Sequence, residues 1–125
     1  MSGGHEESFP SKVVGVTFDN PNGENRQDLI RKHCSPGKEL SLEWEPINPK
    51  DSNAVGVWTE ARLMFVLSRQ IKIGHLNEEL AYRVAAHIAN GGRVRASVTN
   101  VTGGTPDKPS FGVNIWVSLF NQHEL

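Results

Sequence analysis

The sequence predicts a mainly β fold with two short helices (α+β), in which the strands form a small antiparallel β-barrel. Five to seven short segments alternate or are rich in β-branched residues, and only two have helical periodicity, in the order β-α-β-β-β-α-β-β. Two helices are too few to cover both faces of a parallel sheet, which argues against a doubly wound fold. The 125 residues, 37% of them apolar, suffice for one domain.

The N-terminal part divides into a polar stretch, a strand and a helix. We expect a flexible tail over residues 1–11, a single domain over 12–120 and a C-terminal tail over 121–125. Residues 12–18 are rich in β-branched side chains and predict the first strand. A helix is expected at about 26–33, with Asn25 as its N-cap.

The middle of the chain contains the clearest strand pattern. Residues 38–45 alternate strictly, with the apolar side chains of Leu40, Leu42 and Trp44 on one face. A loop at 46–53 leads to a strand over 54–59. A turn is expected at 60–62, followed by one or two strands over 63–73.

The C-terminal part is predicted to contain a helix and two strands. Asn77 is a suitable N-cap for the helix, and Asn90 with Gly91 is a suitable end. Residues 93–102 and 111–119 alternate as strands.

Charge and cysteine content limit the setting in which the protein works. The net charge is −1, but residues 1–60 carry six basic and ten acidic side chains, against seven and four in residues 61–125. This asymmetry suits local contact with a few phosphates, although charge alone favours an ordinary salt-bridged surface. With Cys34 as the single cysteine and no apolar signal or membrane-spanning stretch, a cytoplasmic location without membrane contact is expected.

Sequence patterns typical of catalysis are missing. The chain has no G-x-S-x-G motif, and Cys34 and His33 are adjacent on a helix, where their side chains diverge. The histidines and the cysteine lack metal-ligand spacing. A small hydrolase would lack a matched nucleophile and base, so we expect neither catalytic residues nor a metal or other cofactor.

Three blocks resemble the HIRAN domain family, and the resemblance spans about residues 13–119. The blocks are VVGV at 13–16, EPINPKDSNAV at 45–55 and IGHLNEELA at 73–81. The resemblance implies an OB-like β-barrel that binds single-stranded DNA at a free 3′ end during DNA replication or repair. The implied partners are the DNA end itself and a helicase or other repair protein.

The resemblance also implies which residues contact DNA. Binding a strand end needs an aromatic ring to stack on a base and polar groups to bond the terminal hydroxyl. By position, the implied residues are Phe18 and Phe111 for stacking, Asn48 and Asp51 for the terminal nucleotide, and His75 near the DNA backbone. The DNA-binding relatives begin this pocket with a basic residue and two tyrosines, where this chain has Thr17, Phe18 and Asp19.

Alternatives remain open at each of these positions. Phe18 and Phe111 suit a hydrophobic core, Asp51 suits bonding within its own loop, and His75 suits a structural polar role. The alternative function is a protein-interaction barrel without DNA binding. It would dock a partner or a second copy through the apolar residues 63–67, which lie in an insert at 61–68.

Overall fold

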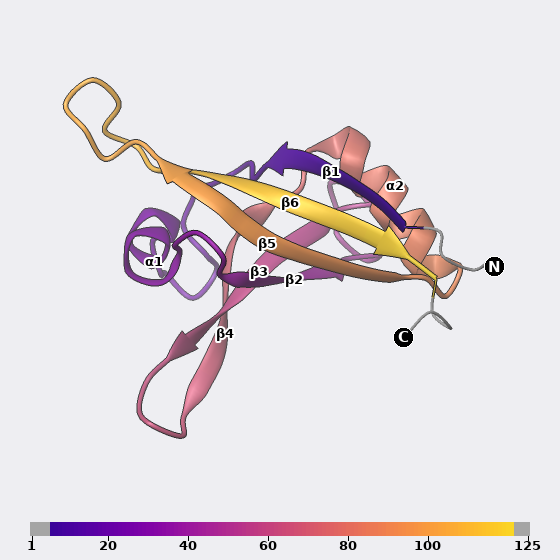
Figure 1. The fold of residues 1–125 in the computed structure, drawn as a ribbon, viewed down its shortest axis with the longest axis horizontal. Helices are drawn as coiled ribbons and strands as arrows, with labels where there is room; N and C mark the ends of the chain where they lie inside the picture. The colour runs from indigo at the N-terminus through magenta and orange to yellow at the C-terminus, as the bar shows by residue number, and fades with distance from the viewer. Residues whose placement is uncertain (1–5, 122–125) are drawn as a thin grey trace.

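The computed structural model describes residues 6–121 and shows one six-stranded antiparallel sheet with two helices (Figure 1). The order of strands in the sheet is β1-β6-β5-β2-β3-β4. The elements are β1 (Glu6–Lys12), α1 (Arg26–His33), β2 (Glu39–Trp44), β3 (Val55–Arg62), β4 (Ser68–His75), α2 (Glu78–Ala89), β5 (Arg93–Thr102) and β6 (Gly112–Phe120). The predicted fold class is therefore confirmed.

Continuous strand pairing does not close this sheet into a barrel. The edge strands β1 and β4 are joined at one point, just after β1, where Val14 and His75 form an isolated antiparallel bridge. Their backbones exchange two hydrogen bonds of 2.8 and 2.9 Å. The word barrel thus applies only loosely, and a single bridge brings the two edges together.

The inner face of the sheet and the helices enclose the hydrophobic core. The alternating apolar residues of the predicted strands face inwards, and α1 packs mainly against β4 while α2 packs across β5, β2 and β3. The largest fully buried apolar side chains are those of Ile30, Ile71, Ile73, Ile115, Val13, Val55, Val57, Val84, Val113 and Val117.

Both helices begin at the expected caps. Asn25 accepts a hydrogen bond from the N–H of Asp28 (3.1 Å), and Asn77 accepts one from the N–H of Leu80 (2.9 Å). These caps satisfy N–H groups that have no partner within a helix. The bounds of α1 and β5 are those expected from the sequence.

The expected first strand over residues 12–18 is wrong. Residues 6–11, expected as a tail, form most of β1 and pair with β6, while the next residues leave the sheet. Gly15 adopts a φ of 71°, and the carbonyls of Gly15 and Val16 accept hydrogen bonds from side chains of α1 instead of a strand. Asn121, the first residue of the expected C-terminal tail, follows the end of β6, and the other expected tail residues, 1–5 and 122–125, lie outside the described residues.

The expected turn at 60–62 is also misplaced. Strand β3 continues to Arg62, and the hairpin turns at residues 63–67, where Leu63 donates a backbone hydrogen bond to Leu67. The apolar residues 63–67 read as strand in the sequence, but they form an exposed tip beyond the sheet.

Candidate functional site

The loop at 46–53 is held by hydrogen bonds from its own side chains. Asn48 Oδ1 accepts from the backbone N–H groups of Lys50 (2.9 Å) and Asp51 (3.4 Å). Asp51 Oδ1 accepts from the N–H of Asn53 at 2.9 Å. Such bonds fix the course of a turn, so the loop expected at 46–53 is rigid.

Asp51 keeps one carboxylate oxygen free for another partner. Within residues 6–121, Oδ2 of Asp51 has no hydrogen-bond partner, and the side chain is only partly buried. An ionised carboxylate only accepts hydrogen bonds. Asp51 can therefore accept a hydrogen bond from a ligand through Oδ2 while Oδ1 holds the loop.

Glu45 joins this loop to strand β4. Its Oε1 accepts from Asn48 Nδ2 (2.9 Å) and lies 3.0 Å from His75 Nε2, and its Oε2 lies 2.5 Å from Lys72 Nζ. We call these four residues the Glu45 cluster. Burial acts to raise the pKa of Glu45, but the hydrogen bonds from Lys72, Asn48 and His75 outweigh burial and lower the pKa to about 2.

His75 ends β4 at the bridge that joins the sheet edges, and its ring is partly buried. Burial lowers the pKa of His75 below the ordinary 6.5, although the hydrogen bond to Glu45 acts in the opposite direction. The positive charges of Lys72 and Arg26 also lower it. At neutral pH the imidazole is therefore mainly uncharged and offers hydrogen bonding rather than a cation.

Phe18 lies on the segment between β1 and α1, and 66% of its surface is exposed. Its N–H donates to the carbonyl of Gly15 at 3.3 Å. A Cβ added at Gly15 would lie 3.6 Å from the Phe18 ring and 3.2 Å from Arg26 Nη1. The ring thus lies beside Gly15 and close to Arg26, with much of its surface open to solvent.

Arg26 is a buried cation that the sequence reasoning missed. It is the first residue of α1 and only 5% exposed. Its Nε donates to Asn20 Oδ1 and its Nη1 to the carbonyl of Gly15, both at 2.8 Å. Burial lowers the pKa of Arg26, and the nearby Glu45 charge acts to raise it. The backbone N–H of Arg26 donates to the carbonyl of Phe18 at 3.3 Å, and Asn20 donates to the carbonyl of Lys72 at 2.9 Å, so Arg26 and Asn20 connect Phe18 with the Glu45 cluster.

Phe111 is held by Gln27, the residue that follows Arg26 in α1. Its N–H donates to Gln27 Oε1 (2.6 Å), and Gln27 Nε2 donates to the carbonyls of Phe111 (3.0 Å) and Val16 (2.9 Å). The ring packs against the core and lies so close to Gly104 that a Cβ there would meet it at 2.4 Å. The Phe111 ring therefore has a packing role in this structure.

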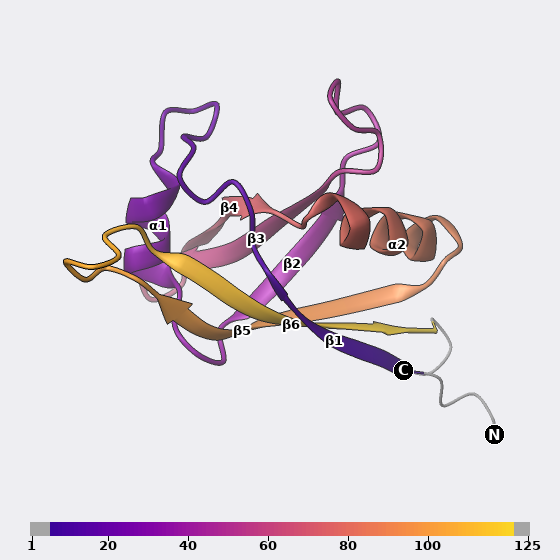
Figure 2. The same ribbon diagram turned by 90° about the horizontal axis from the view of Figure 1, so that it is seen from above.

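The structure links four of the five residues implied by the resemblance through one chain of contacts. Asn48 and His75 meet at Glu45, Asp51 lies in the same loop as Asn48, and Phe18 lies next to Arg26. The loops that follow β1 and β2 rise on the same side of the molecule (Figure 2). Only Phe111 is connected indirectly.

Two further members of this arrangement had weak signals in the sequence. Glu45 opens the second motif block, which marks its position without suggesting its partners. Lys72 is the polar residue between Ile71 and Ile73, so alternation predicts that it points outwards but not that it meets Glu45. Arg26 followed an N-cap, and nothing in its sequence context predicts burial.

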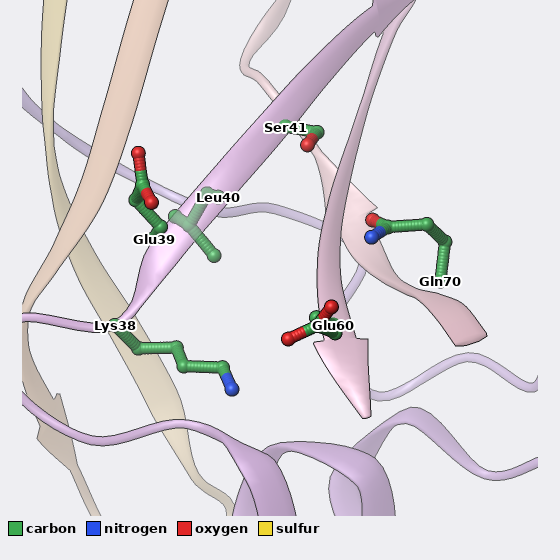
Figure 3. Close-up of a pocket in the computed structure, with 6 residues that line it drawn as sticks. All are labelled: Lys38, Glu39, Leu40, Ser41, Glu60 and Gln70. Carbon is green, nitrogen blue, oxygen red and sulfur yellow. The ribbon is translucent and has the colours of Figure 1, made fainter. Parts of the chain in front are cut away.

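A separate polar hollow of about 400 Å³ lies on the outer side of β2, β3 and β4 (Figure 3). It is lined by Lys38, Glu39, Leu40, Ser41, Glu60 and Gln70. None of the residues implied by the resemblance lines it, and it has no aromatic ring on which a base could stack. Its Glu60 accepts a hydrogen bond from Ser68 at 2.9 Å. The Glu45 cluster with Phe18 is the better candidate site.

A metal centre, a membrane span and a reactive thiol are other features that a chain of this kind can carry. Within residues 6–121, no group of three or more His, Cys, Asp or Glu side chains is placed to hold a metal ion. In the same part of the chain, neither helix is long and apolar enough to cross a membrane. Burial raises the pKa of the free Cys34 thiol to about 11, which keeps it protonated at neutral pH.

Comparison with known proteins agrees with the sequence resemblance. A family model described as HIRAN domain matches residues 7–119. The crystal structure of the HIRAN domain of human HLTF has a TM-score of 0.61 at 20% identity, covering 94% of this chain and 78% of that one. A crystal structure of a Lactobacillus plantarum protein, a structural genomics target, has a TM-score of 0.58 at 19% identity, covering 91% and 98%. Among curated proteins, no sequence matches.

The fold is that of a small, β-rich domain with two helices. The family model covers most of the chain, and the chain therefore belongs to the HIRAN domain family. The resemblance expected from the three sequence blocks is confirmed. The two structural likenesses, both at low identity, support the fold.

Proposed function

We propose that this protein binds the free 3′ end of single-stranded DNA and catalyses no reaction of its own. HIRAN domains are generally DNA-binding modules for single strands and their 3′ ends. The observation that carries the proposal is the exposed Phe18 ring, linked through Arg26 and the Glu45 cluster to a rigid loop with a free Asp51 oxygen. An open ring and a free acceptor are the two elements that recognition of a strand end requires.

Each side chain has a distinct role in this proposal. Phe18 stacks on the terminal base, and such stacking contributes about 1–3 kcal/mol per base. Asp51 Oδ2 accepts the hydrogen bond of the 3′-hydroxyl, while Asn48 bonds the same nucleotide. His75 lies near the DNA backbone, and Phe111, which is bonded to Gln27 together with Val16, steadies the segment that carries Phe18.

Charge in the site favours a hydroxyl over a phosphate at the strand end. A 3′-phosphate would place added negative charge beside Asp51 and near the ionised Glu45, and it would remove the hydroxyl donor. The relatives have a basic residue where this chain has Thr17. In this chain Arg26 places a positive charge near Phe18 instead. The site therefore accommodates one terminal nucleotide rather than a series of phosphates.

Fluorescence anisotropy with single strands that end in a 3′-hydroxyl or a 3′-phosphate tests the proposal. We expect clearly weaker binding of the phosphorylated strand, and weaker binding of both by Phe18→Ala. Asp51→Asn keeps an oxygen for the Asn53 N–H and removes the charge, so it should reduce the preference for the hydroxyl. Tyr82→Ala, which removes an exposed aromatic ring on α2, is the matched control.

Equal binding of the two strands, or no binding of either at low salt, would contradict the proposal. We also propose that the domain acts during DNA replication or repair beside a helicase or other repair protein, in the cytoplasm. The support for this context is family membership. Failure of the protein to associate with stalled replication forks in cells would count against it.

A second candidate function is protein binding through the hairpin tip. Residues 63–67 expose five consecutive apolar side chains, with Phe65 96% exposed. Contiguous exposed apolar surface is typical of interaction sites. If the strand-end preference is absent and Phe65→Ser converts a concentration-dependent dimer into a monomer, this function replaces the first.

A further inference from the structure

The outer surface of β1, β6 and β5 carries an exposed tryptophan. Trp116 lies in the middle of β6 with 46% of its surface exposed. Its neighbours Ile115 and Val117 are fully buried, so alternation along the strand directs Trp116 away from the core. A single exposed aromatic residue needs no special explanation, and its surroundings decide what it does.

Trp116 stands between two shallow hollows. The first, of about 570 Å³, lies towards the start of β6, and its polar lining includes Lys12, Asn100 and Asn114. The second, of about 180 Å³, lies towards the end of β6, and its polar lining consists of Glu39, Arg95, Ser97 and Ser118. A planar group can therefore lie on either side of the indole, next to a cation and to hydrogen-bonding side chains.

The cations on this surface are not neutralised by pairing. Within residues 6–121, Lys12, Arg93 and Arg95 form no ion pair, and all three are exposed. Arg95 lies 5.7 Å from the centre of the Phe120 ring, which points to the same side of β6 as Trp116. The carboxylates nearest along the strands are those of Glu6 and Glu39. We call Trp116, Lys12, Arg93, Arg95, Asn100 and Asn114 the Trp116 face.

We propose that the Trp116 face binds the interior of a single strand of DNA, independently of any strand end. Single-strand binding sites without sequence preference combine aromatic stacking platforms with cations that follow the backbone. Here bases would stack on Trp116 from the two hollows, and Lys12 and Arg95 would contact the phosphates on either side. The amides of Asn100 and Asn114 can bond base edges of any sequence.

The length of the Trp116 face fits a short segment of DNA. Strand β6 runs from Gly112 to Phe120, which at about 3.3 Å per residue is about 26 Å. Site sizes on folds of this type begin at about 4 nucleotides. The face therefore has room for the smallest sites of this kind.

The Trp116 face and the strand-end site lie on opposite sides of the molecule. Figure 2 shows the loops after β1 and β2 projecting from one side, whereas β1, β6 and β5 form the other. One nucleotide cannot contact both surfaces. The two sites can therefore be tested with different DNA molecules, and either can fail without the other.

Circular single-stranded DNA, which has no 3′ end, isolates the Trp116 face. We expect the protein to bind the circle at low salt and Trp116→Ala to weaken this binding by about 5- to 100-fold. Trp116→Phe should restore part of it, because a smaller ring still stacks. Tyr82→Ala should leave it unchanged, since that exposed ring lies on α2. The preference of Trp116→Ala for a 3′-hydroxyl over a 3′-phosphate should persist.

Salt dependence tests the cations separately. Replacing Lys12 or Arg95 by Ala should each reduce the slope of log affinity against log salt by about 1, as expected for one lost phosphate contact. Arg31→Ala, on the exposed side of α1, is the control. The proposal is overturned if the circle does not bind, or if Trp116→Ala binds it as the parent does. It is also overturned if Trp116→Ala instead dissociates a dimer, which would make the face a contact between two copies.

Discussion

The Glu45 cluster and the Trp116 face hold their charges in opposite ways. In the cluster, Lys72 and His75 both contact one partly buried carboxylate, and Asn48 ties that carboxylate to a rigid loop. On the face, Lys12 and Arg95 are exposed and form no ion pair within residues 6–121. Paired charges fix positions, whereas unpaired exposed charges attract a polyanion without fixing it. The first arrangement suits recognition of one nucleotide and the second suits retention of a strand.

The largest expected effect comes from Gly74, beside the bridge that holds the strand-end site. A Cβ at Gly74 would lie 2.4 Å from the Val14 carbonyl oxygen and 2.5 Å from Val13 Cγ1. Gly74→Ala should therefore disrupt the bridge and lower the free energy of unfolding by about 3 kcal/mol. Urea unfolding measures this loss, and strand-end preference should weaken while circle binding persists.

Gly23→Asn is the control for this substitution. Gly23 has a φ of 91°, nothing lies within 4 Å of a Cβ added there, and asparagine tolerates this backbone region. We expect Gly23→Asn to lower the free energy of unfolding by less than about 1 kcal/mol. Equal losses for the two variants would mean that the bridge does not support the site.

The second effect concerns the charge of Glu45. Glu45→Gln removes the counter-charge of Lys72 and should lower the free energy of unfolding at pH 7 by about 1–2 kcal/mol. Because the folded pKa of about 2 lies below the ordinary 4.5, this contribution is present above pH 4.5 and is lost as the pH falls towards 2. The difference between parent and variant in urea unfolding should therefore shrink over that range. Glu43→Gln, at an exposed position of β2, should show no such trend.

The third effect is the titration of His75. Its folded pKa should lie below 6.5 by NMR, because burial disfavours the charged ring. The neutral ring therefore contributes stability that is present above pH 6.5 and is lost as the pH falls through the folded pKa. Lys72→Ala should raise this pKa, since it removes a positive charge and leaves Glu45 to His75. Lys32→Ala should leave it unchanged, and a parent pKa above 6.5 would contradict the cluster geometry.

The smallest effects on stability are expected on the Trp116 face. Lys12→Ala and Arg95→Ala should each change the free energy of unfolding by less than about 0.5 kcal/mol, because neither cation is paired or buried. Thermal unfolding at low ionic strength checks this. A loss comparable to that of Glu45→Gln would show that these cations stabilise the fold, and the contrast between the two sites would disappear.

The sequence predicts the elements whose causes are local. The Asn25 cap and the helix after it, and the alternation along β5, depend on neighbours in the chain and were placed correctly. Strand β1 was not predicted because Ser8 is polar and Pro10 disfavours a strand. Pairing with β6, which is distant in the sequence, outweighs these local preferences. Residues 12–18 look like a strand, yet side chains of α1 bond their carbonyls.

The sequence predicts the loop of the candidate site, but it does not predict which charged side chains meet there. Asn48 and Asp51 act within four residues of each other, so their turn follows from the sequence. Lys72 meets Glu45, and Arg26 meets Gly15, only because the fold brings distant segments together. Likewise, alternation directs Trp116 outwards, but its cationic neighbours come from β1 and β5.

Beyond the bridge at Val14, the segment that leads to α1 is held from the first turn of the helix, where Arg26 and Gln27 donate to the carbonyls of Gly15 and Val16. Loss of that turn would free the segment and the Phe18 ring together. Amide protons of the segment and of α1 should thus exchange with solvent as one unit. A nucleotide bound beside Phe18 would therefore slow hydrogen exchange along the helix as well.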